Sequence, residues 1–296
     1  MIPRLAAYPM PDPATFPTSS VSWTPQAGRS VLLVHDLQSY FLNFYDVTQP
    51  PVPVLLAHVQ ALLDRCRALG IPVVYTAQPG DQNPADRALL TDLWGTGLKD
   101  DPAQTQVDPA VAPQPGDTVL AKWRYSAFKR TPLQDLMADW GRDQLLICGI
   151  YANIGCLMTA AEAFMLDIQP FLVGDALADF SEAEHRQALA YGAARCAQVT
   201  STAQVLGALT AVVQPAAQTD HWTPAAVRAA VAAQLEVTPD ELHEDDDLLL
   251  LGLDSIRLMM LVEGWQAAGG QIAYADVAAE PTLRAITERL CAPELV

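Results

Sequence analysis

Apolar and polar residues follow two different patterns along residues 30–211. Short runs rich in Val, Leu and Ile are separated by longer stretches whose apolar residues recur at helical spacing. The short runs lie at 30–36, 71–78, 117–122, 143–150 and 169–176, and the helical stretches lie at 54–69, from about 155, at 182–195 and at 201–211. Continuous apolar strands separated by helices are typical of a parallel sheet that helices cover on both faces. The pattern therefore predicts an α/β fold whose ligands bind at the carboxyl ends of the strands.

The pattern becomes purely helical toward the end of the chain. Helical spacing is present in three further segments, 223–235, 253–270 and 282–290. The stretch just before them, residues 214–222, is rich in Pro, Ala and polar residues and lacks apolar periodicity. We therefore predict a large α/β domain over residues 1–213, a linker over 214–222 and a small all-α helix bundle over 223–296.

Charge and cysteine content narrow the function. The formal net charge is -17, of which residues 222–296 contribute -9 through 4 Arg/Lys and 13 Asp/Glu. Such acidity argues against binding to nucleic acid or anionic membranes and favours basic protein partners. The five cysteines have irregular spacing, which predicts neither disulfides nor a zinc site. No long apolar run and no signal peptide is evident, so we expect a cytoplasmic protein.

Candidate chemistry gathers where predicted strands end. Asp36, Lys122 and Gly155 each lie at or just beyond such an end, so a parallel sheet brings them to one edge. Taken singly, Asp36 would more often be a turn cap and Lys122 a surface charge. Because strand side chains alternate, His35 should point away from Asp36 and have a structural role. Cys156 lies near a predicted helix start, where a thiol is activated, and is an alternative nucleophile.

Three segments resemble the signature segments of the isochorismatase-like hydrolases. They are "LLVHDLQSYF" with Asp36, "AKWRYSAF" with Lys122 and "GIYANIGCLMTA", and the resemblance covers most of residues 1–211. It implies an α/β/α sandwich with a parallel sheet. It also matches Asp36 and Lys122 to the first two members of the Asp, Lys, Cys triad that many members use.

The third segment departs from the family pattern. Counting the motif G-x-x-T-x-x-C from Gly149 puts Gly155 in the nucleophile's place and Cys156 one residue late. Loss of the cysteine resembles the true isochorismatases of the family. These enzymes hydrolyse the enol ether of isochorismate to pyruvate and 2,3-dihydro-2,3-dihydroxybenzoate.

Enol-ether hydrolysis explains this substitution, because it needs a proton donor and no nucleophile. By resemblance, Asp36 is the general acid and Lys122 its positioning charge, while Gly155 leaves room for the substrate ring. Lys122 should lower the pKa of Asp36, whereas a general acid must be protonated. We therefore expect Asp36 to become protonated mainly in the substrate complex.

The resemblance also implies the residues that line the substrate pocket. These are Gln78, Arg87, Trp94 and Tyr151, with Phe41 and Tyr125 as weaker candidates. Arg87 suits a bidentate contact with a substrate carboxylate; the alternative is a surface salt bridge within its own helix. Related amidases with a metal site carry D-x-H after the second strand, where this chain reads "QPGDQ". We therefore expect no catalytic metal.

The small domain has a motif of its own. In "LGLDSIRLMML" the residue Ser255 stands at the first turn of an apolar helix, where a lone serine is usually an N-cap. The acidic bundle and the L-G-x-D-S motif together resemble the acyl and peptidyl carrier family over residues 223–292. That resemblance implies 4'-phosphopantetheine attached covalently to Ser255.

Together the two domains resemble the bifunctional isochorismatase/aryl carrier proteins of catechol siderophore biosynthesis. The resemblance implies isochorismate as substrate and an activated aryl acid, 2,3-dihydroxybenzoate, as cargo. The implied partners are an aryl-acid adenylating enzyme, a phosphopantetheinyl transferase, a nonribosomal peptide synthetase condensation domain and a second copy of the chain in a homodimer. Two alternatives stay open: a carrier and docking protein with an inactive large domain, and a cysteine amidase of the nicotinamidase type that uses Cys156.

Overall fold

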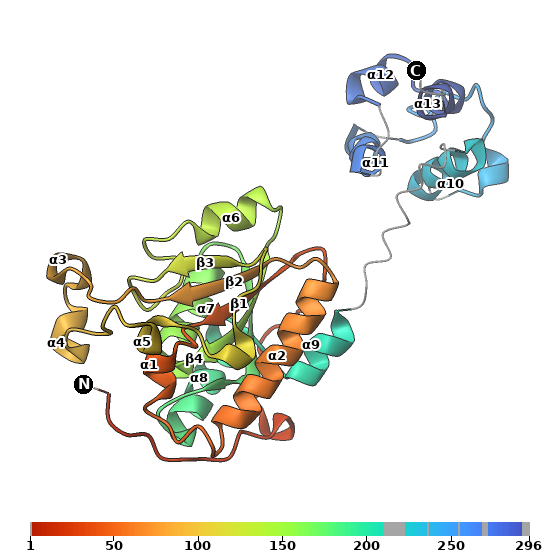
Figure 1. The fold of residues 1–296 in the computed structure, drawn as a ribbon. Coiled ribbons are helices and arrows are strands. Elements are labelled where there is room, and N and C mark those ends of the chain that lie inside the picture. Colours follow the sequence, from red (N-terminus) through yellow and green to blue (C-terminus); the bar gives the residue numbers. More distant parts are fainter. Residues whose placement is uncertain (1, 210–222, 236, 254, 268–271, 292–296) are drawn as a thin grey trace. The chain divides into compact units, whose positions relative to one another are not determined.

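The chain divides into two compact units, Met1–Val212 and Val213–Val296 (Figure 1). The computed structural model describes residues 2–209, 223–235, 237–253, 255–267 and 272–291. The predicted linker, residues 214–222, lies outside the described residues. Each unit is therefore described by itself.

A parallel sheet forms the centre of the large unit. Its strands are β1 (Ser30–His35), β2 (Val73–Ala77), β3 (Thr118–Ala121), β4 (Gln144–Ile150), β5 (Gln169–Ala178) and β6 (Gln198–Thr200). Within the described part of the chain they form one six-stranded sheet in the order β3-β2-β1-β4-β5-β6, and the neighbouring strands are parallel. The strands β1 to β5 coincide with the five predicted apolar runs. The edge strand β6 was not predicted, because three residues are too few to show a pattern.

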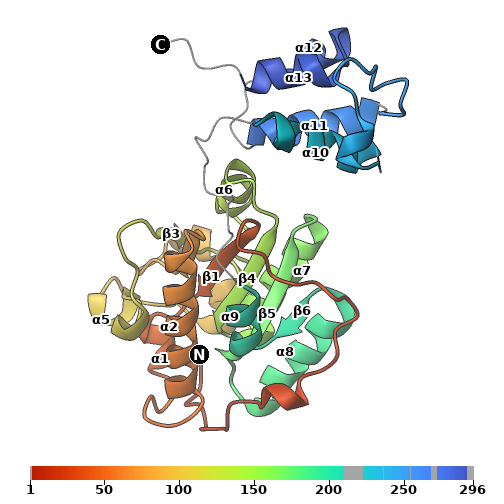
Figure 2. The same ribbon diagram turned by 90° about the vertical axis from the view of Figure 1, so that its right-hand side faces the viewer.

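Helices cover both faces of the sheet, as Figure 2 shows with α2 on one side and α7 and α8 on the other. One layer contains α2 (Val52–Ala68) and α9 (Thr202–Ala208), and the other contains α6 (Leu133–Asp139), α7 (Leu157–Met165) and α8 (Glu182–Arg195). Along β1, Leu32 and Val34 belong to the first core, and Val31 and Leu33 to the second. This alternation is how one apolar strand fills two cores. The predicted α/β/α sandwich is confirmed.

Short elements surround the carboxyl ends of the strands and the loops between them. They are the helices α1 (Ser39–Leu42), α3 (Pro84–Arg87), α4 (Leu90–Trp94) and α5 (Pro102–Thr105), the 3₁₀ turns Pro13–Thr15 and Pro109–Val111, and a π turn at Ala152–Cys156. Prolines begin many of these elements, as expected for a residue without an N–H at a helix start. Of these elements, α1, α3, α4 and the π turn contribute residues to the wall of the site described below.

A close approach of two strands sets the geometry at this edge of the sheet. His35 at the end of β1 lies opposite Gly149 in β4. Gly149 has a φ of 110°, and a Cβ there would lie 2.2 Å from the carbonyl oxygen of His35. Only glycine allows this approach. It brings the end of β1 against the segment that leaves β4 toward the π turn.

The small unit is a helix bundle, as predicted. Its elements are α10 (Pro224–Leu235), a 3₁₀ turn at Pro239–Glu241, α11 (Ser255–Ala267), α12 (Tyr274–Ala279) and α13 (Leu283–Leu290). Apolar residues from these helices form a separate core, which includes Val227, Val231, Leu258, Leu261 and Ile286. Helix α12 was not predicted, because its six residues are too short for a periodic signal.

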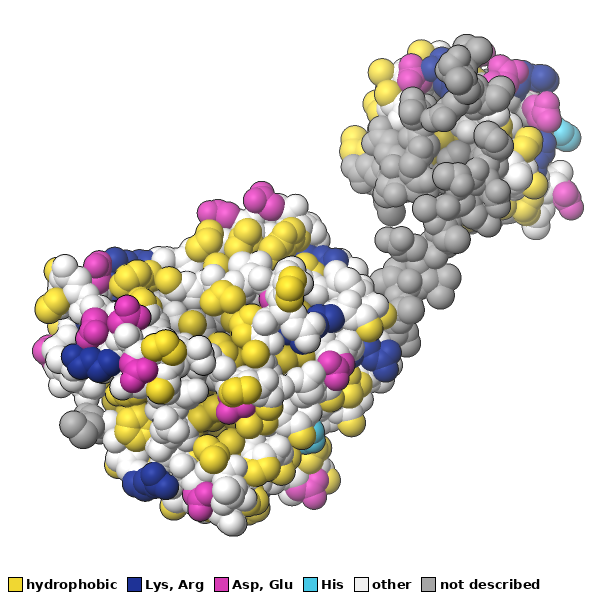
Figure 3. All heavy atoms as spheres, in the orientation of Figure 1, with side chains coloured by type: hydrophobic (Ala, Val, Ile, Leu, Met, Phe, Trp, Pro, Cys, Tyr) yellow, Lys and Arg dark blue, Asp and Glu magenta, His cyan; other side chains and the backbone are white. Residues whose placement is uncertain are grey.

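The visible surface of the large unit is mixed. Figure 3 shows acidic and basic side chains interspersed with apolar ones on this face. Among the residues that the structure describes, no helix is long and apolar enough to cross a membrane.

Candidate active site

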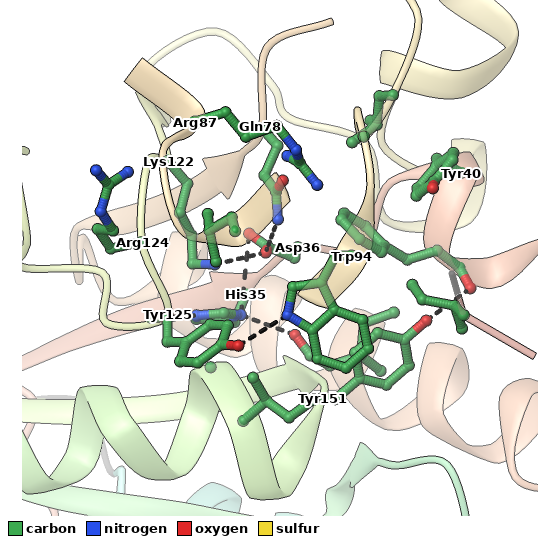
Figure 4. A pocket seen from close by; sticks show the side chains of 18 of the residues that line it. His35, Asp36, Tyr40, Gln78, Arg87, Trp94, Lys122, Arg124, Tyr125 and Tyr151 are labelled. Atoms are coloured by element: carbon green, nitrogen blue, oxygen red, sulfur yellow. Dashed lines mark hydrogen bonds and ion pairs between the residues drawn. The ribbon is translucent and has the colours of Figure 1, made fainter. Parts of the chain in front are cut away.

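A pocket opens at the carboxyl ends of β1, β2, β3 and β4 (Figure 4). Its wall combines aromatic and aliphatic side chains with a few charged and polar groups, as the walls of small-molecule sites usually do. The structure brings every residue predicted for the hydrolase site to its wall: Asp36, Phe41, Gln78, Arg87, Trp94, Lys122, Tyr125, Tyr151 and Gly155. They come from segments far apart in the sequence, and the parallel sheet unites them.

Asp36 is the centre of a hydrogen-bonded cluster. It follows β1 with a φ of 50°, and its carboxylate is buried. Lys122 donates to Oδ2 over 2.7 Å and Thr76 donates to Oδ1 over 2.6 Å. Gln78 Nε2 lies 3.4 Å from Oδ2. The side chain of Gln38 positions Gln78: Gln38 Oε1 accepts the backbone N–H of Gln78 over 2.7 Å, and Gln38 Nε2 donates to the carbonyl oxygen of Gln78 over 2.9 Å. The carboxylate is thus fixed in position before any ligand binds.

Opposing effects act on the protonation of Asp36. Burial raises its pKa, but the ammonium group of Lys122 and the hydrogen bonds from Lys122 and Thr76 lower it by more. The net result is a pKa below the usual value. In the free pocket Asp36 and Lys122 therefore form a buried ion pair. This agrees with the expectation that the acid form has to be produced in the complex.

His35 corrects one expectation. It was predicted to point away from Asp36, yet both residues line the pocket, with His35 Nδ1 3.9 Å from Asp36 Oδ1. The reason is the φ of 50° at Asp36, which ends the regular alternation of the strand. His35 Nδ1 lies 2.8 Å from the carbonyl oxygen of Ile150, and Nε2 lies 3.3 Å from that of Tyr125. Burial lowers the pKa of His35 to about 4, so the imidazole is neutral at physiological pH.

Gly155 lies in the π turn that follows β4 and the cis peptide bond between Ile150 and Tyr151. A Cβ at residue 155 would lie 2.1 Å from His35 Cε1. The space that a side chain at residue 155 would need is therefore occupied by His35. That Gly155, which lines the pocket, leaves room for the substrate ring stays a prediction.

Cys156 does not suit the role of a nucleophile. It is fully buried in the core between the sheet and α7. Burial raises its thiol pKa well above the usual value, and reactive thiols need the opposite shift. Among the described residues, Cys156 is not part of the pocket wall. These observations argue against the amidase alternative.

Arg87 is held on a short capped helix. Asn83 caps α3 by accepting the N–H of Ala85 at 2.9 Å, and Arg87 Nε donates to the carbonyl oxygen of Gly95 over 2.6 Å. The side chain is only 4% exposed, so the alternative of a surface salt bridge is wrong. Its Nη1 has no hydrogen-bond partner within the described part of the chain. A buried unpaired donor is unfavourable, and a ligand carboxylate would satisfy it.

Aromatic side chains form the apolar wall of the pocket. Trp94 Nε1 donates to the hydroxyl of Tyr125 over 2.7 Å. Tyr151 donates to the carbonyl oxygen of Phe41 over 3.2 Å and packs edge-on against Phe180, with ring centroids 4.6 Å apart. This wall can hold a six-membered ring while the polar cluster faces the opposite side.

Sequence reasoning missed part of the lining: His35, Tyr40, Arg124, Ile154 and Phe180. Arg124 follows Lys122 by two residues and Phe180 follows the end of β5, so the argument from strand ends could have reached both. Arg124 Nη1 donates to the carbonyl oxygens of Asp86 and Trp123.

The charges of the pocket wall are unbalanced. Within the described residues, the lining carries the cations Arg87, Lys122 and Arg124, and the anion Asp36. The difference, three positive charges minus one negative, is +2. Such a pocket favours a ligand with two negative charges. No group of three or more His, Cys, Asp or Glu in the described chain could hold a metal ion.

A second candidate site lies in the small unit. Ser255 is the first residue of α11, and Gly252, with a φ of 105°, lies in the turn before it. In the segment just before this turn, Leu250 is exposed. A hydroxyl at a helix start suits a phosphodiester, because the backbone N–H groups and the helix dipole favour negative charge there. The attachment of 4'-phosphopantetheine to Ser255 stays a prediction.

The fold and the buried Asp–Lys pair at the strand ends define a hydrolase of the isochorismatase-like class. Residues 30–204 match the isochorismatase domain family, and residues 225–290 match the phosphopantetheine attachment site family. The chain therefore belongs to the isochorismatase family and carries a phosphopantetheine-binding domain after the hydrolase domain. The predicted enzyme class and the predicted cofactor are thereby confirmed.

Relatives align over nearly the whole chain. An isochorismatase from Bacillus subtilis is 47% identical over 95% of this chain and 93% of its own length. Enterobactin synthase component B from Escherichia coli is 44% identical over 96% of each chain. Among solved structures, a cysteine hydrolase from Pseudomonas syringae is similar in fold, with a TM-score of 0.58, 24% identity and coverage of 65% of this chain and 97% of that one. The catalytic roles of individual residues stay predictions.

Proposed function

We propose that the large unit hydrolyses isochorismate to pyruvate and 2,3-dihydro-2,3-dihydroxybenzoate, with Asp36 as the general acid. The observation that carries the proposal is the buried Asp36–Lys122 ion pair inside a pocket whose wall has an excess of two positive charges. Isochorismate carries two carboxylates, an enol ether and a six-membered ring. The names of the relatives support this choice of substrate.

The reaction needs one proton donor and one water molecule. Asp36 donates its proton to the terminal methylene carbon of the enol ether, and the electrons of the double bond form the new C–H bond. The resulting oxocarbenium ion is stabilised by the Asp36 carboxylate. Water adds to this cation and returns a proton to Asp36. Collapse of the hemiketal breaks the bond to the ring, which leaves as an alcohol, and releases pyruvate.

Substrate binding supplies the conditions for this step. Two bound carboxylates add negative charge beside Asp36 and exclude water, and both effects raise its pKa. Arg87 offers an unpaired Nη1 for one carboxylate, and Arg124 or Lys122 lies on the same wall for the other. Thr76 keeps Oδ1 of Asp36 oriented, and Lys122 stabilises the carboxylate after proton transfer.

The substitution Asp36→Asn tests the assignment of the acid. Asparagine keeps the shape but cannot donate the proton, so we expect kcat for pyruvate release from isochorismate to fall by about 10²–10⁴-fold. The matched control is Asp135→Asn, on the exposed side of α6, which should leave the rate unchanged. Full activity of Asp36→Asn would exclude Asp36 as the acid. A wild-type protein that releases no pyruvate would favour the alternative of an inactive docking domain.

We further propose that the hydrolase domain covers residues 1–213, that residues 214–222 link the domains, and that residues 223–296 are an aryl carrier domain. When bound on Ser255, 4'-phosphopantetheine supplies a thiol that carries an acyl group as a thioester. The name enterobactin synthase component B, printed for a relative, supports 2,3-dihydroxybenzoate as cargo in siderophore synthesis. The proposed partners are the adenylating enzyme, the phosphopantetheinyl transferase and the condensation domain. A homodimer is a further prediction, which analytical ultracentrifugation tests.

A further inference from the structure

His35 and Gly155 occupy a single volume next to Asp36. A Cβ built on Gly155 would lie 2.1 Å from Cε1, 2.7 Å from Nε2 and 3.0 Å from Nδ1 of the His35 ring. The two shorter distances are far inside van der Waals contact, which for carbon atoms is about 3.5–4.0 Å. No side chain at residue 155 is therefore compatible with the present position of the imidazole. Figure 4 shows His35 below Asp36 and near Tyr125.

The imidazole is not free to move away from this place. Its Nδ1 lies 2.8 Å from the carbonyl oxygen of Ile150, within hydrogen-bond distance. Nε2 lies 3.3 Å from the carbonyl oxygen of Tyr125. The side chain is 1% exposed, so displacing the ring would break a buried hydrogen bond and leave polar groups unpaired.

The imidazole of His35 is uncharged, unlike Asp36 and Lys122 beside it. Burial lowers its pKa, the Asp36 carboxylate raises it and Lys122 lowers it, and the net result is a lowered pKa. A neutral ring adds no positive charge beside Asp36, and its two nitrogens face the backbone carbonyl oxygens of Ile150 and Tyr125. His35 is therefore a wall of the pocket and does not compete with Asp36 as acid.

We propose that His35 is a specificity-determining residue, because its imidazole fills the volume that the side chain of a nucleophile at residue 155 would need. The exclusion of covalent catalysis then depends on two residues, Gly155 and His35, that face each other. Replacing glycine alone does not create a nucleophilic site, whereas replacing both opens one. The activity measurements below rest on the proposed hydrolysis of isochorismate, and the alkylation measurement does not.

A double-mutant cycle measures the contact. We expect Gly155→Ala to lower both the melting temperature and kcat/KM for pyruvate release, since its methyl group collides with the ring. Adding His35→Ala should restore kcat/KM at least about tenfold relative to Gly155→Ala alone, because residues in contact are coupled. The control is His185→Ala, which removes another buried histidine, on α8, and should give no rescue. A Gly155→Ala variant with wild-type stability and activity would overturn the proposal.

Thiol alkylation tests the second half of the inference. In Gly155→Cys we expect the introduced thiol to react slowly with iodoacetamide, and in Gly155→Cys/His35→Ala we expect at least about tenfold faster reaction, since access governs thiol reactivity. Peptide mass mapping separates this segment from the other native thiols, of which Cys291 is partly exposed. Fragmentation of the peptide then separates residue 155 from the adjacent buried Cys156.

The outcomes separate the two proposals. Equal alkylation rates in the single and double variants would overturn the role of His35. If the Gly155→Cys chain does not fold and adding His35→Ala restores folding, that rescue supports the contact; if folding is not restored, the Gly155→Ala cycle decides. Absence of pyruvate release from the wild-type protein would refute the proposed function, while the alkylation rates would still test His35.

Discussion

Asp36 is surrounded by groups that favour its charged form, although the proposed chemistry uses its neutral form. Lys122 and Thr76 lower the pKa of this buried carboxyl group in the free pocket. The same contacts fix its orientation. We interpret the cluster as a preorganised site in which the bound substrate changes the protonation state, and two predictions follow at the scale of single residues.

The first prediction concerns pH. Asp36 has a lowered pKa in the free enzyme, and the dianionic substrate should raise it in the complex. We expect kcat to be constant at low pH and to fall about tenfold per pH unit above the pKa of Asp36 in the complex. Because kcat/KM reports the free enzyme, it should begin to fall at a lower pH than kcat. Pyruvate release measured from about pH 5 to pH 9 checks this; a kcat that stays constant over the range would contradict it.

The second prediction concerns Arg87. In Arg87→Lys the charge is kept but the bidentate geometry is lost. A charge-assisted hydrogen bond contributes about 1.5–3 kcal/mol, so we expect KM for isochorismate to rise about 10–100-fold with a smaller change in kcat. Arg29→Lys is the matched control, because Arg29 pairs with Asp143 at the surface. An unchanged KM in Arg87→Lys would exclude Arg87 from carboxylate binding.

At the scale of elements, the end of β5 is tied to the π turn that follows β4. Asp179 directly follows β5, and its carboxylate accepts the backbone N–H groups of Asn153 in the π turn and of Phe180. Phe180 packs against Tyr151 in the pocket wall. Burial raises the pKa of Asp179 to about 6. The connection between the two elements therefore depends on a group that titrates below neutral pH.

The third prediction follows from that pKa. The folded protein binds a proton at Asp179 more tightly than the unfolded chain, whose reference pKa is 3.8. The resulting stabilisation is complete below about pH 4 and is lost as pH rises through about 6, an effect of up to about 3 kcal/mol. In Asp179→Asn this dependence disappears. The difference in the free energy of unfolding between wild type and variant should therefore change between about pH 4 and pH 7.

Urea unfolding of the two proteins, followed by tryptophan fluorescence, measures this difference. Asp108→Asn is a suitable control, since Asp108 caps a 3₁₀ turn in another part of the large unit. Unfolding free energies of wild type and Asp179→Asn that stay parallel over the whole pH range would contradict the prediction.

At the scale of the whole molecule, each unit has its own core and its own candidate site. The pocket with Asp36 is built from residues of the large unit alone, and Ser255 begins a helix of the small unit. Among the described residues, each site is made of residues from its own unit. The two activities should therefore be separable by single substitutions in the full chain.

The fourth prediction tests this separation. Ser255→Ala should gain no mass on incubation with coenzyme A and a phosphopantetheinyl transferase, yet release pyruvate from isochorismate at the wild-type rate. Asp36→Asn should gain the mass of the phosphopantetheine group but lose most of its pyruvate release. Intact mass and a pyruvate assay give both readings, and Thr287→Ala, which removes a hydroxyl from α13, serves as the control. A mass gain in Ser255→Ala would place the attachment elsewhere.

Much of the site could be predicted, because its residues follow strand ends. Asp36 and Lys122 were found by this argument, and the resemblance added the residues of the aromatic wall and Arg87. The relative direction of the His35 and Asp36 side chains could not be predicted, since it depends on the positive φ of Asp36. Burial of Arg87 was likewise invisible, because it is enclosed by the backbone of Gly95 and Gly97 in the loop that follows.

By itself, the sequence determined the α/β pattern, the helical bundle after it and part of the set of residues that line the pocket. Apolar periodicity, capping residues and motif spacing act between near neighbours in the chain, so they can be read directly. Only the tertiary structure decided that His35 fills the space beside Gly155 and that Asp36 is buried beside Lys122. These are contacts between distant segments, and their geometry depends on how the strands of the sheet pair and end.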